Sequence, residues 1–117
     1  MNKKIDFFND LLNKNKFILA SIFGDSVRIK ILEILLDNAL QKEIKWLNIS
    51  EIAKLTGIST SSSKRIIDNL IEEKIVELNP LYVQTHVKNP EKEIKLNVNN
   101  KMINELIFFY RKLKGFV

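Results

Sequence analysis

The sequence contains no cysteine and only one histidine, His86. Disulfide bonds and thiolate metal sites are therefore excluded, and one histidine cannot build a zinc site by itself. There is no glycine-rich phosphate loop, and no convincing pair of catalytic carboxylates can be placed. We therefore expect no metal, no cofactor and no enzymatic activity.

Long hydrophobic runs are missing as well. Apolar stretches such as residues 103–110 are far shorter than the roughly 18 to 20 residues that a membrane-spanning helix needs. Near the N-terminus, Asp6, Asn9, Asp10 and Asn13 interrupt the apolar residues, so this segment lacks the continuous core of a signal peptide. We expect a cytoplasmic protein without a membrane partner.

What the chain does contain is a globular composition with a basic balance. Its 117 residues are 45% hydrophobic and 28% charged, which suits one domain with its own core over residues 1–117. The formal net charge of +5 favours a polyanionic partner such as a nucleic acid, because neutralised phosphates release their counterions. Such a charge is common, so it is weak support by itself.

The spacing of apolar residues predicts two helices in the first third of the chain. Residues 3–22 place apolar side chains at helical spacing with lysines between them, which indicates an amphipathic helix. Gly24 ends this helix, and Asp25 or Ser26 can cap a second helix that runs to about Asn38. A polar connector follows, and residues 46–49 can form a short strand.

Two further helices joined by a glycine turn are predicted in the middle of the chain. Ser50 can cap a short helix, which ends at Gly57 because glycine readily takes the left-handed conformation at a helix C-terminus. Ser59 can then cap a helix that runs to about Lys74. The residues expected on its inward face are Ser63, Ile67, Leu70 and Ile71. A hydroxyl at the core-facing position 63 can bond back to the carbonyl four residues earlier.

Strands and a last helix complete the predicted order. Residues 75–78 are a short β-prone run, and residues 82–87 and 93–98 alternate apolar and polar side chains on either side of a turn at 89–92. This pattern predicts a β-hairpin between the two alternating segments. Residues 100–114 are predicted to form an amphipathic C-terminal helix.

This order of elements is that of a winged helix-turn-helix, a mainly helical α+β fold, here with additional amphipathic helices at both ends of a core over residues 25–98. Residues 24–32 resemble the opening of the first core helix in ArsR-type winged-helix repressors, which typically reads Asp-Pro-Thr-Arg before an apolar run. Residues 49–77 are similar to the helix-turn-helix of that family. The chain also resembles the minimal winged-helix regulators of archaea, their viruses and plasmids.

The resemblance implies that the helix over about residues 59–74 enters the major groove of double-stranded DNA. Its first turns offer short polar side chains, which allow close approach to base edges, and cations for guanine or phosphate. The candidate DNA-binding residues on it are Thr60, Ser61, Ser62, Lys64, Arg65 and Asn69. Lys54 on the preceding helix is a candidate for positioning on the DNA backbone. The alternative is a capping turn followed by a solvated charged face.

The hairpin over about residues 82–98 is expected to be the wing, lying on the DNA backbone or in the minor groove. Its candidate contacts are His86, Lys88, Lys92 and Lys95. Glu91 and Glu93 offset part of their charge. The alternative is a hairpin tip that is simply solvated.

The two terminal helices suggest a homodimer. A winged-helix core does not require both, and their apolar stripes would stay partly exposed on a monomer, as is typical of an interface. In the family these helices pair across a two-fold axis, which implies two recognition helices on an inverted-repeat operator. The candidate dimerisation residues are Phe8, Leu12, Met102, Leu106, Phe109, Tyr110 and Leu113. The alternative is that both helices cover one core.

The sequence thus predicts a sequence-specific DNA-binding transcriptional regulator. Many ArsR-type proteins sense metals through cysteines, but the matching positions here are Asn48 and Ser50, so that role is not supported. Constitutive DNA binding and regulation by a partner protein both remain open. The competing hypothesis is a winged helix used for protein–protein contact in a transcription, replication or DNA-partition assembly.

Overall fold

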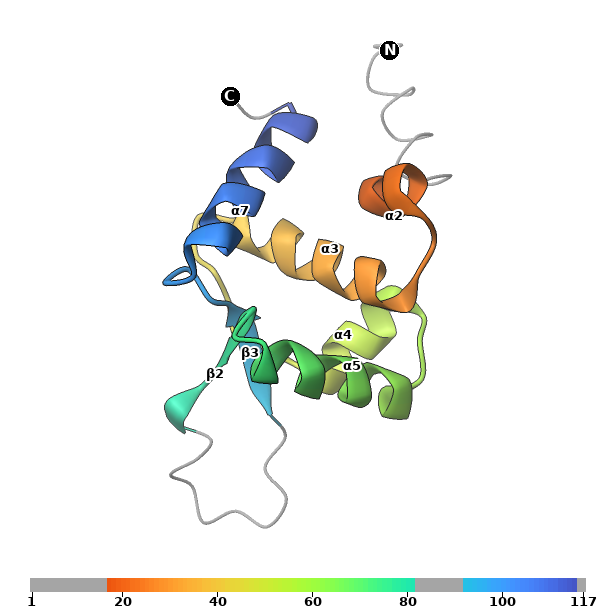
Figure 1. The fold of residues 1–117 in the computed structure, drawn as a ribbon. Helices are drawn as coiled ribbons and strands as arrows, with labels where there is room; N and C mark the ends of the chain where they lie inside the picture. The colour runs from red at the N-terminus through yellow and green to blue at the C-terminus, as the bar shows by residue number, and fades with distance from the viewer. Residues whose placement is uncertain (1–16, 82–91, 116–117) are drawn as a thin grey trace, which may run out of the picture.

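The computed structural model describes residues 17–81 and 92–115, which are arranged around a central helix (Figure 1). The elements are, in order, α2 (Ile18–Phe23), α3 (Val27–Ala39), β1 (Leu47–Asn48), α4 (Ile49–Thr56), α5 (Thr60–Glu72), β2 (Val76–Leu78), β3 (Glu93–Leu96) and α7 (Lys101–Leu113). α3 lies across the middle, with α2 and α7 on one side of it and α4, α5 and the strands on the other. Of the helix predicted over residues 3–22, the part before residue 17 lies outside the described residues.

Local hydrogen bonds explain where the helices begin. Ser26, one of the two predicted caps, accepts a hydrogen bond from the N–H of Ile29 (3.1 Å) and starts α3. α4 is capped by Asn48 and not by Ser50, which corrects the prediction. The Asn48 side chain accepts from the N–H of Glu51, and the Glu51 carboxylate accepts from the N–H of Asn48. This reciprocal capping box starts α4 directly after β1.

The strands form a three-stranded antiparallel sheet in the order β1–β3–β2. Val76 and Leu78 of β2 pair with Leu96 and Ile94 of β3. The hairpin partner predicted for β3, residues 82–87, lies outside the described residues. The partners of β3 that the structure shows are β1 and β2, and β2 is the β-prone run predicted over residues 75–78. This register places buried Val76 opposite buried Leu96, and such cross-strand pairs stabilise a sheet.

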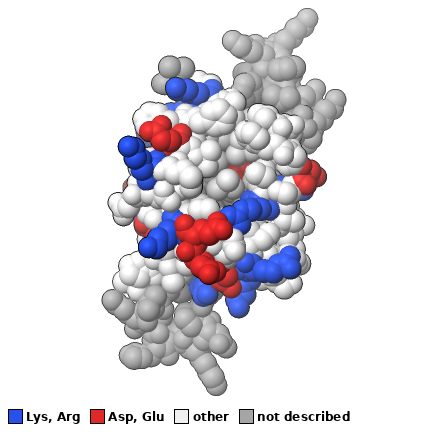
Figure 2. Space-filling model, viewed as in Figure 1, with Lys and Arg blue, Asp and Glu red and all other residues white. Residues whose placement is uncertain are grey.

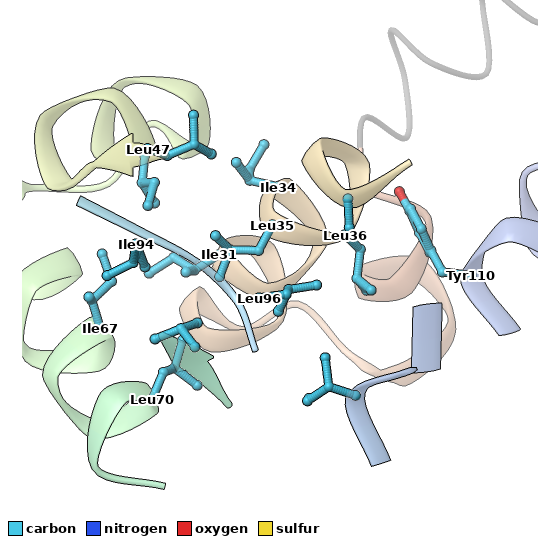
Figure 3. Close-up of a cluster of buried hydrophobic side chains, with 14 of the residues drawn as sticks. Ile31, Ile34, Leu35, Leu36, Leu47, Ile67, Leu70, Ile94, Leu96 and Tyr110 are labelled. Atoms are coloured by element: carbon cyan, nitrogen blue, oxygen red, sulfur yellow. The ribbon is translucent and has the colours of Figure 1, made fainter. Parts of the chain in front are cut away.

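The hydrophobic core extends from α3 to the elements on both sides of it (Figure 3). Its fully buried side chains on α3 are Ile31, Leu35 and Leu36. The cluster continues through Ile67 and Leu70 of α5, Ile94 and Leu96 of β3, and Ile103 and Tyr110 of α7. The C-terminal helix therefore shares a core with the helix-turn-helix. The order α3, β1, α4, α5, β2, β3 is that of a winged helix, so the predicted mainly helical α+β class is confirmed.

Candidate nucleic-acid interface

The helix-turn-helix of α4 and α5 depends on a left-handed glycine and a serine cap, both of which were predicted. Gly57 has φ 73°, a conformation that favours glycine, and the following N–H of Ile58 donates to the carbonyl of Ala53 (3.1 Å). Ser59 then accepts from the N–H of Ser62 (3.2 Å). The cap satisfies one of the free N–H groups at the start of α5.

The packing of α5 decides which of its side chains face outward. Ser63, Ile67 and Leu70 are buried, and their spacing of three to four residues defines the inward face. The exposed candidates on the outward side are Thr60, Ser61, Lys64 and Arg65. Ser62 is half-buried. The first half of α5 thus presents two short hydroxyl side chains next to two cations.

Two of the predicted DNA contacts have partners within the chain. The side-chain oxygen of Asn69 accepts a hydrogen bond from Nη1 of Arg28 (2.8 Å). The ammonium of Lys92 forms an ion pair with Asp68 of α5 (3.2 Å). Both side chains are therefore engaged by other parts of the fold before any ligand is bound.

The remaining predicted DNA contacts lie on other elements. Lys54 is exposed on α4. Lys95 lies on β3, where its ammonium is 3.6 Å from Glu77 and 4.4 Å from the centre of the Trp46 ring. His86 and Lys88 lie outside the described residues. The described part of the hairpin therefore offers no free lysine of the predicted set.

The charge along α5 changes sign. Its first half carries Lys64 and Arg65, and its end carries Asp68, Glu72 and, as its C-cap, Glu73. Figure 2 shows the molecule from the same side as Figure 1. Basic and acidic side chains lie next to one another over the middle of the visible surface and do not form one uninterrupted basic patch. Because carboxylates repel phosphates, only the first half of α5 suits close contact with a nucleic acid.

The hydroxyl of Ser63 is buried without a hydrogen-bond partner among the described residues. The predicted bond back to the carbonyl four residues earlier is therefore not formed. Burying a hydroxyl without a partner costs about 1 to 3 kcal/mol. Ser63 consequently weakens the contact between α5 and the core.

α7 leaves an apolar stripe on its surface, which consists of Met102, Leu106, Phe109 and Leu113 and is called here the α7 stripe. Met102 is 63% exposed, Phe109 45% and Leu113 36%, while Leu106 is half-buried. Tyr110, which was predicted to belong to the same interface, is instead 0% exposed. It packs into the core of its own chain, so it offers no surface to a partner. The other two candidates, Phe8 and Leu12, lie outside the described residues.

A buried carboxylate that no sequence pattern indicates joins three helices. Glu33 of α3 is 0% exposed and accepts hydrogen bonds from the N–H groups of Ile18 (2.7 Å) and Leu19 (2.6 Å) at the start of α2. Its other contact is the hydroxyl of Tyr110 on α7 (3.1 Å). Since the N-cap residue of α2 provides no side-chain cap, Glu33 supplies the cap from another helix.

The Tyr110 hydroxyl lies between two carboxylates. Its oxygen is 2.6 Å from Asp37 and 3.1 Å from Glu33. The ammonium of Lys114 is 3.4 Å from Asp37, which offsets part of the negative charge. Burial, the hydrogen bond to Asp37 and the two negative charges raise the pKa of Tyr110 well above its ordinary value. The phenol therefore stays protonated and acts as a donor.

Other kinds of site have little support in the described residues. They contain no cluster of metal-binding side chains and no helix long and apolar enough to cross a bilayer. A hollow of about 220 Å³ beside α7 is lined mainly by apolar side chains, with Asn104 and Arg111 at its edge. Among the described residues that line it, Arg111 is the one with an ionisable side chain.

Comparison with known proteins agrees with the winged-helix architecture. No family model and no curated protein matches the sequence. The fold is similar to RV1404 from Mycobacterium tuberculosis, with a TM-score of 0.52 and 16% identity over 97% of this chain and 78% of that one. It is similar to the adhesin competence repressor AdcR from Streptococcus pyogenes, with a TM-score of 0.50 and 15% identity over 96% and 73% of the two chains.

A third similar structure is a MarR/EmrR family transcriptional regulator from Acinetobacter sp. ADP1 (TM-score 0.50, 16% identity, 97% and 74% of the two chains). At such identities the similarity shows a shared fold. The protein is thus a winged-helix protein whose helix-turn-helix presents a polar, partly cationic helix.

Proposed function

We propose that this protein is a sequence-specific, double-stranded DNA-binding transcriptional regulator and not an enzyme, with α5 in the major groove. The observation that carries this proposal is the exposed first half of α5, where Thr60 and Ser61 stand beside Lys64 and Arg65. Two of the similar structures have repressor or regulator names, which supports the same use of the fold. The ArsR type rests on the sequence resemblance alone.

The roles of the side chains follow from their chemistry. Lys64 and Arg65 donate to N7 and O6 of guanine, the commonest specific contact in the major groove. The hydroxyls of Thr60 and Ser61 donate to or accept from any base, and Lys54 contacts a phosphate. The wing, including His86 and Lys88, would lie on the backbone or in the minor groove.

The proposed regulator is a homodimer that binds an inverted repeat. The α7 stripe supports this, because exposed apolar side chains at helical spacing are typical of a protein interface. Phe8 and Leu12 are proposed to extend the interface. Two-fold symmetry would then place the two recognition helices on successive turns of the major groove.

Selection of duplexes from a randomised pool, followed by measurement of their affinity, tests the DNA-binding proposal. We expect the wild type to enrich one motif, and the double variant Lys64→Ala, Arg65→Ala to bind it at least about tenfold more weakly, because each good base contact contributes about 1 to 3 kcal/mol. The matched control is Lys42→Ala, Lys45→Ala, which removes the same charge from exposed positions in the connector. Equal affinities of both double variants would contradict the proposal and favour a protein-contact module.

Light scattering at micromolar concentration tests the dimer. Phe109→Glu places a charge in the α7 stripe and is expected to yield monomers. Phe108→Glu is the matched control, since Phe108 is 61% exposed but lies about 100° around the helix from its neighbour. A monomeric wild type, or equal effects of the two substitutions, would contradict this interface.

A further inference from the structure

Arg28 connects the start of α3 to the acidic end of α5. Its Nη1 donates to the Asn69 side-chain oxygen (2.8 Å), and its Nη2 donates to Oε2 of Glu73 (2.7 Å). Asn69 and Glu73 are four residues apart and therefore neighbours on one face of the helix. A guanidinium fits this arrangement because its N–H groups form a fixed fork, which the ammonium of a lysine cannot reproduce.

The position of this contact matters for α5 as a reading helix. The first half of α5 carries the proposed DNA contacts, and Arg28 contacts α5 further along, at Asn69, about one turn after Arg65, and at Glu73, about two turns after it. A rigid helix is oriented by what holds both of its ends, and the start of α5 is fixed by the Ser59 cap and the turn before it. Ile67 and Leu70 pack α5 against the core, and Arg28 adds a polar contact nearer its C-terminal end, which contributes to the direction in which the first half of the helix projects.

The same contact changes the charge that DNA would meet. Glu73 is a carboxylate on the recognition helix, and its ion pair with Arg28 neutralises it. Asp68 is neutralised by Lys92 in a similar way. Without such pairs, the acidic end of α5 would repel the phosphates that flank the major groove.

We propose that Arg28 is a positioning residue for DNA recognition, which orients α5 and neutralises Glu73 without touching DNA itself. This inference rests on the proposed function and assigns a role to a residue outside the exposed first half of α5. It also reassigns Asn69, which holds Arg28 and does not read a base. The side chains of Arg28 and Glu73 are 42% and 51% exposed, so their pair contributes little to the free energy of unfolding.

The test uses the duplex that the wild type selects from a randomised pool. We expect Arg28→Ala to lower the affinity for it about fivefold to tenfold, with no resolved change in the thermal unfolding midpoint. A salt titration separates positioning from direct contact. Lys54→Ala, which removes a proposed phosphate contact, should reduce the slope of log affinity against log salt by about 0.9. Arg28→Ala should change that slope by much less, because it removes no phosphate contact and adds only a repulsion that salt screens.

Two double variants of equal net charge test whether the loss of affinity comes from the Glu73 carboxylate or from the change in net charge. Arg28→Ala, Glu73→Gln restores the wild-type net charge and removes the exposed carboxylate, so it should recover the part of the affinity that was lost to repulsion, but not the part that was lost with the positioning contact. Arg28→Ala, Glu43→Gln has the same net charge, but Glu43 is an exposed residue of the connector between α3 and β1, so it should stay weak.

The outcomes separate failure of the positioning role of Arg28 from failure of the proposed function. A wild type that selects no sequence overturns the proposed function, and with it the role of Arg28, before any variant is made. A wild type that selects a sequence, with an Arg28→Ala variant that binds it equally well, overturns only the positioning role. A salt slope that falls by about 0.9 in Arg28→Ala, or equal recovery by both double variants, also overturns it.

Discussion

Two polar clusters in this protein lie at opposite sides of α3 and differ in their burial and in their hydrogen-bond partners. The cluster around Glu33 is buried, and its carboxylate receives hydrogen bonds from α2 and lies against the hydroxyl of Tyr110 on α7. The cluster at the start of α5 is exposed, and Lys64 and Arg65 have no ion-pair partner among the described residues. A buried, satisfied polar group holds a fold together, whereas an exposed one is available for a ligand.

Of the substitutions in the two clusters, Glu33→Gln should have the largest effect on the free energy of unfolding. The substitution turns one acceptor oxygen into an N–H₂ donor, which faces backbone N–H groups of α2 or the Tyr110 hydroxyl. We expect the free energy of unfolding to fall by about 3 kcal/mol, because hydrogen bonds to a buried charged group are lost. Urea unfolding measures the change. Glu43→Gln on the exposed connector is the control, and an equal effect of both substitutions would contradict the role of Glu33.

Tyr110→Phe should have the second largest effect. It preserves the ring in the core but removes the donor that lies between Asp37 and Glu33. The expected loss is about 1 to 2 kcal/mol, measured by urea unfolding at neutral pH. An unchanged free energy of unfolding would show that the hydroxyl does not link α7 to α3.

The same variant should change how stability depends on alkaline pH. Because the folded protein raises the pKa of Tyr110 above its ordinary value of 10.0, the unfolded chain releases this proton first. The stabilisation is therefore complete below pH 10 and is lost as the pH rises further, by up to about 1.4 kcal/mol per pH unit. Tyr110→Phe should flatten this decline. Parallel stability curves for wild type and variant above pH 10 would contradict the shifted pKa.

Ser63→Ala should have a smaller effect, in the opposite direction. It removes a buried hydroxyl without a partner and adds a residue that favours helix, so we expect the protein to gain about 1 kcal/mol of stability. DNA affinity should stay the same, because the side chain faces inward. Ser61→Ala on the exposed side is the control for helix propensity, and an equal gain there would show that the buried hydroxyl costs nothing.

The smallest change in stability is expected for the exposed cluster. Lys64→Ala, Arg65→Ala should alter the free energy of unfolding by no more than about 0.5 kcal/mol, as is usual for surface positions. Its effect should appear in duplex affinity instead. A marked loss of stability would show that the two side chains also hold the fold, and the contrast between the two clusters would disappear.

Much of the fold follows from local patterns in the sequence. The glycine turn at Gly57, the caps at Ser26 and Ser59 and the inward face of α5 depend on neighbouring residues, and the structure confirms them. Asn48 and not Ser50 caps α4 because a capping box needs an acidic or amide residue three positions later, and Glu51 is that residue. This signal was present in the sequence, so the cap was predictable.

The contacts between distant segments were not predictable in this way. Glu33 is one charge within an apolar run, and only the tertiary structure shows that the start of α2 and Tyr110 meet it. Likewise, Arg28 reaches residues more than 40 positions later in the chain. Helical spacing places Tyr110 near the stripe that was predicted as an interface, but it cannot tell which flank the core of the same chain covers.

The attachment of α5 has a consequence for how such a protein can evolve. The helix is held by Ser59 at its start and by Ile67 and Leu70 on its inner side, and none of these is a proposed reading residue. Mutations at Thr60, Ser61, Lys64 or Arg65 can therefore accumulate without compensating changes in the core. In the proposed function, substitutions at these few exposed positions would change which duplex is bound and leave the packing beneath them the same.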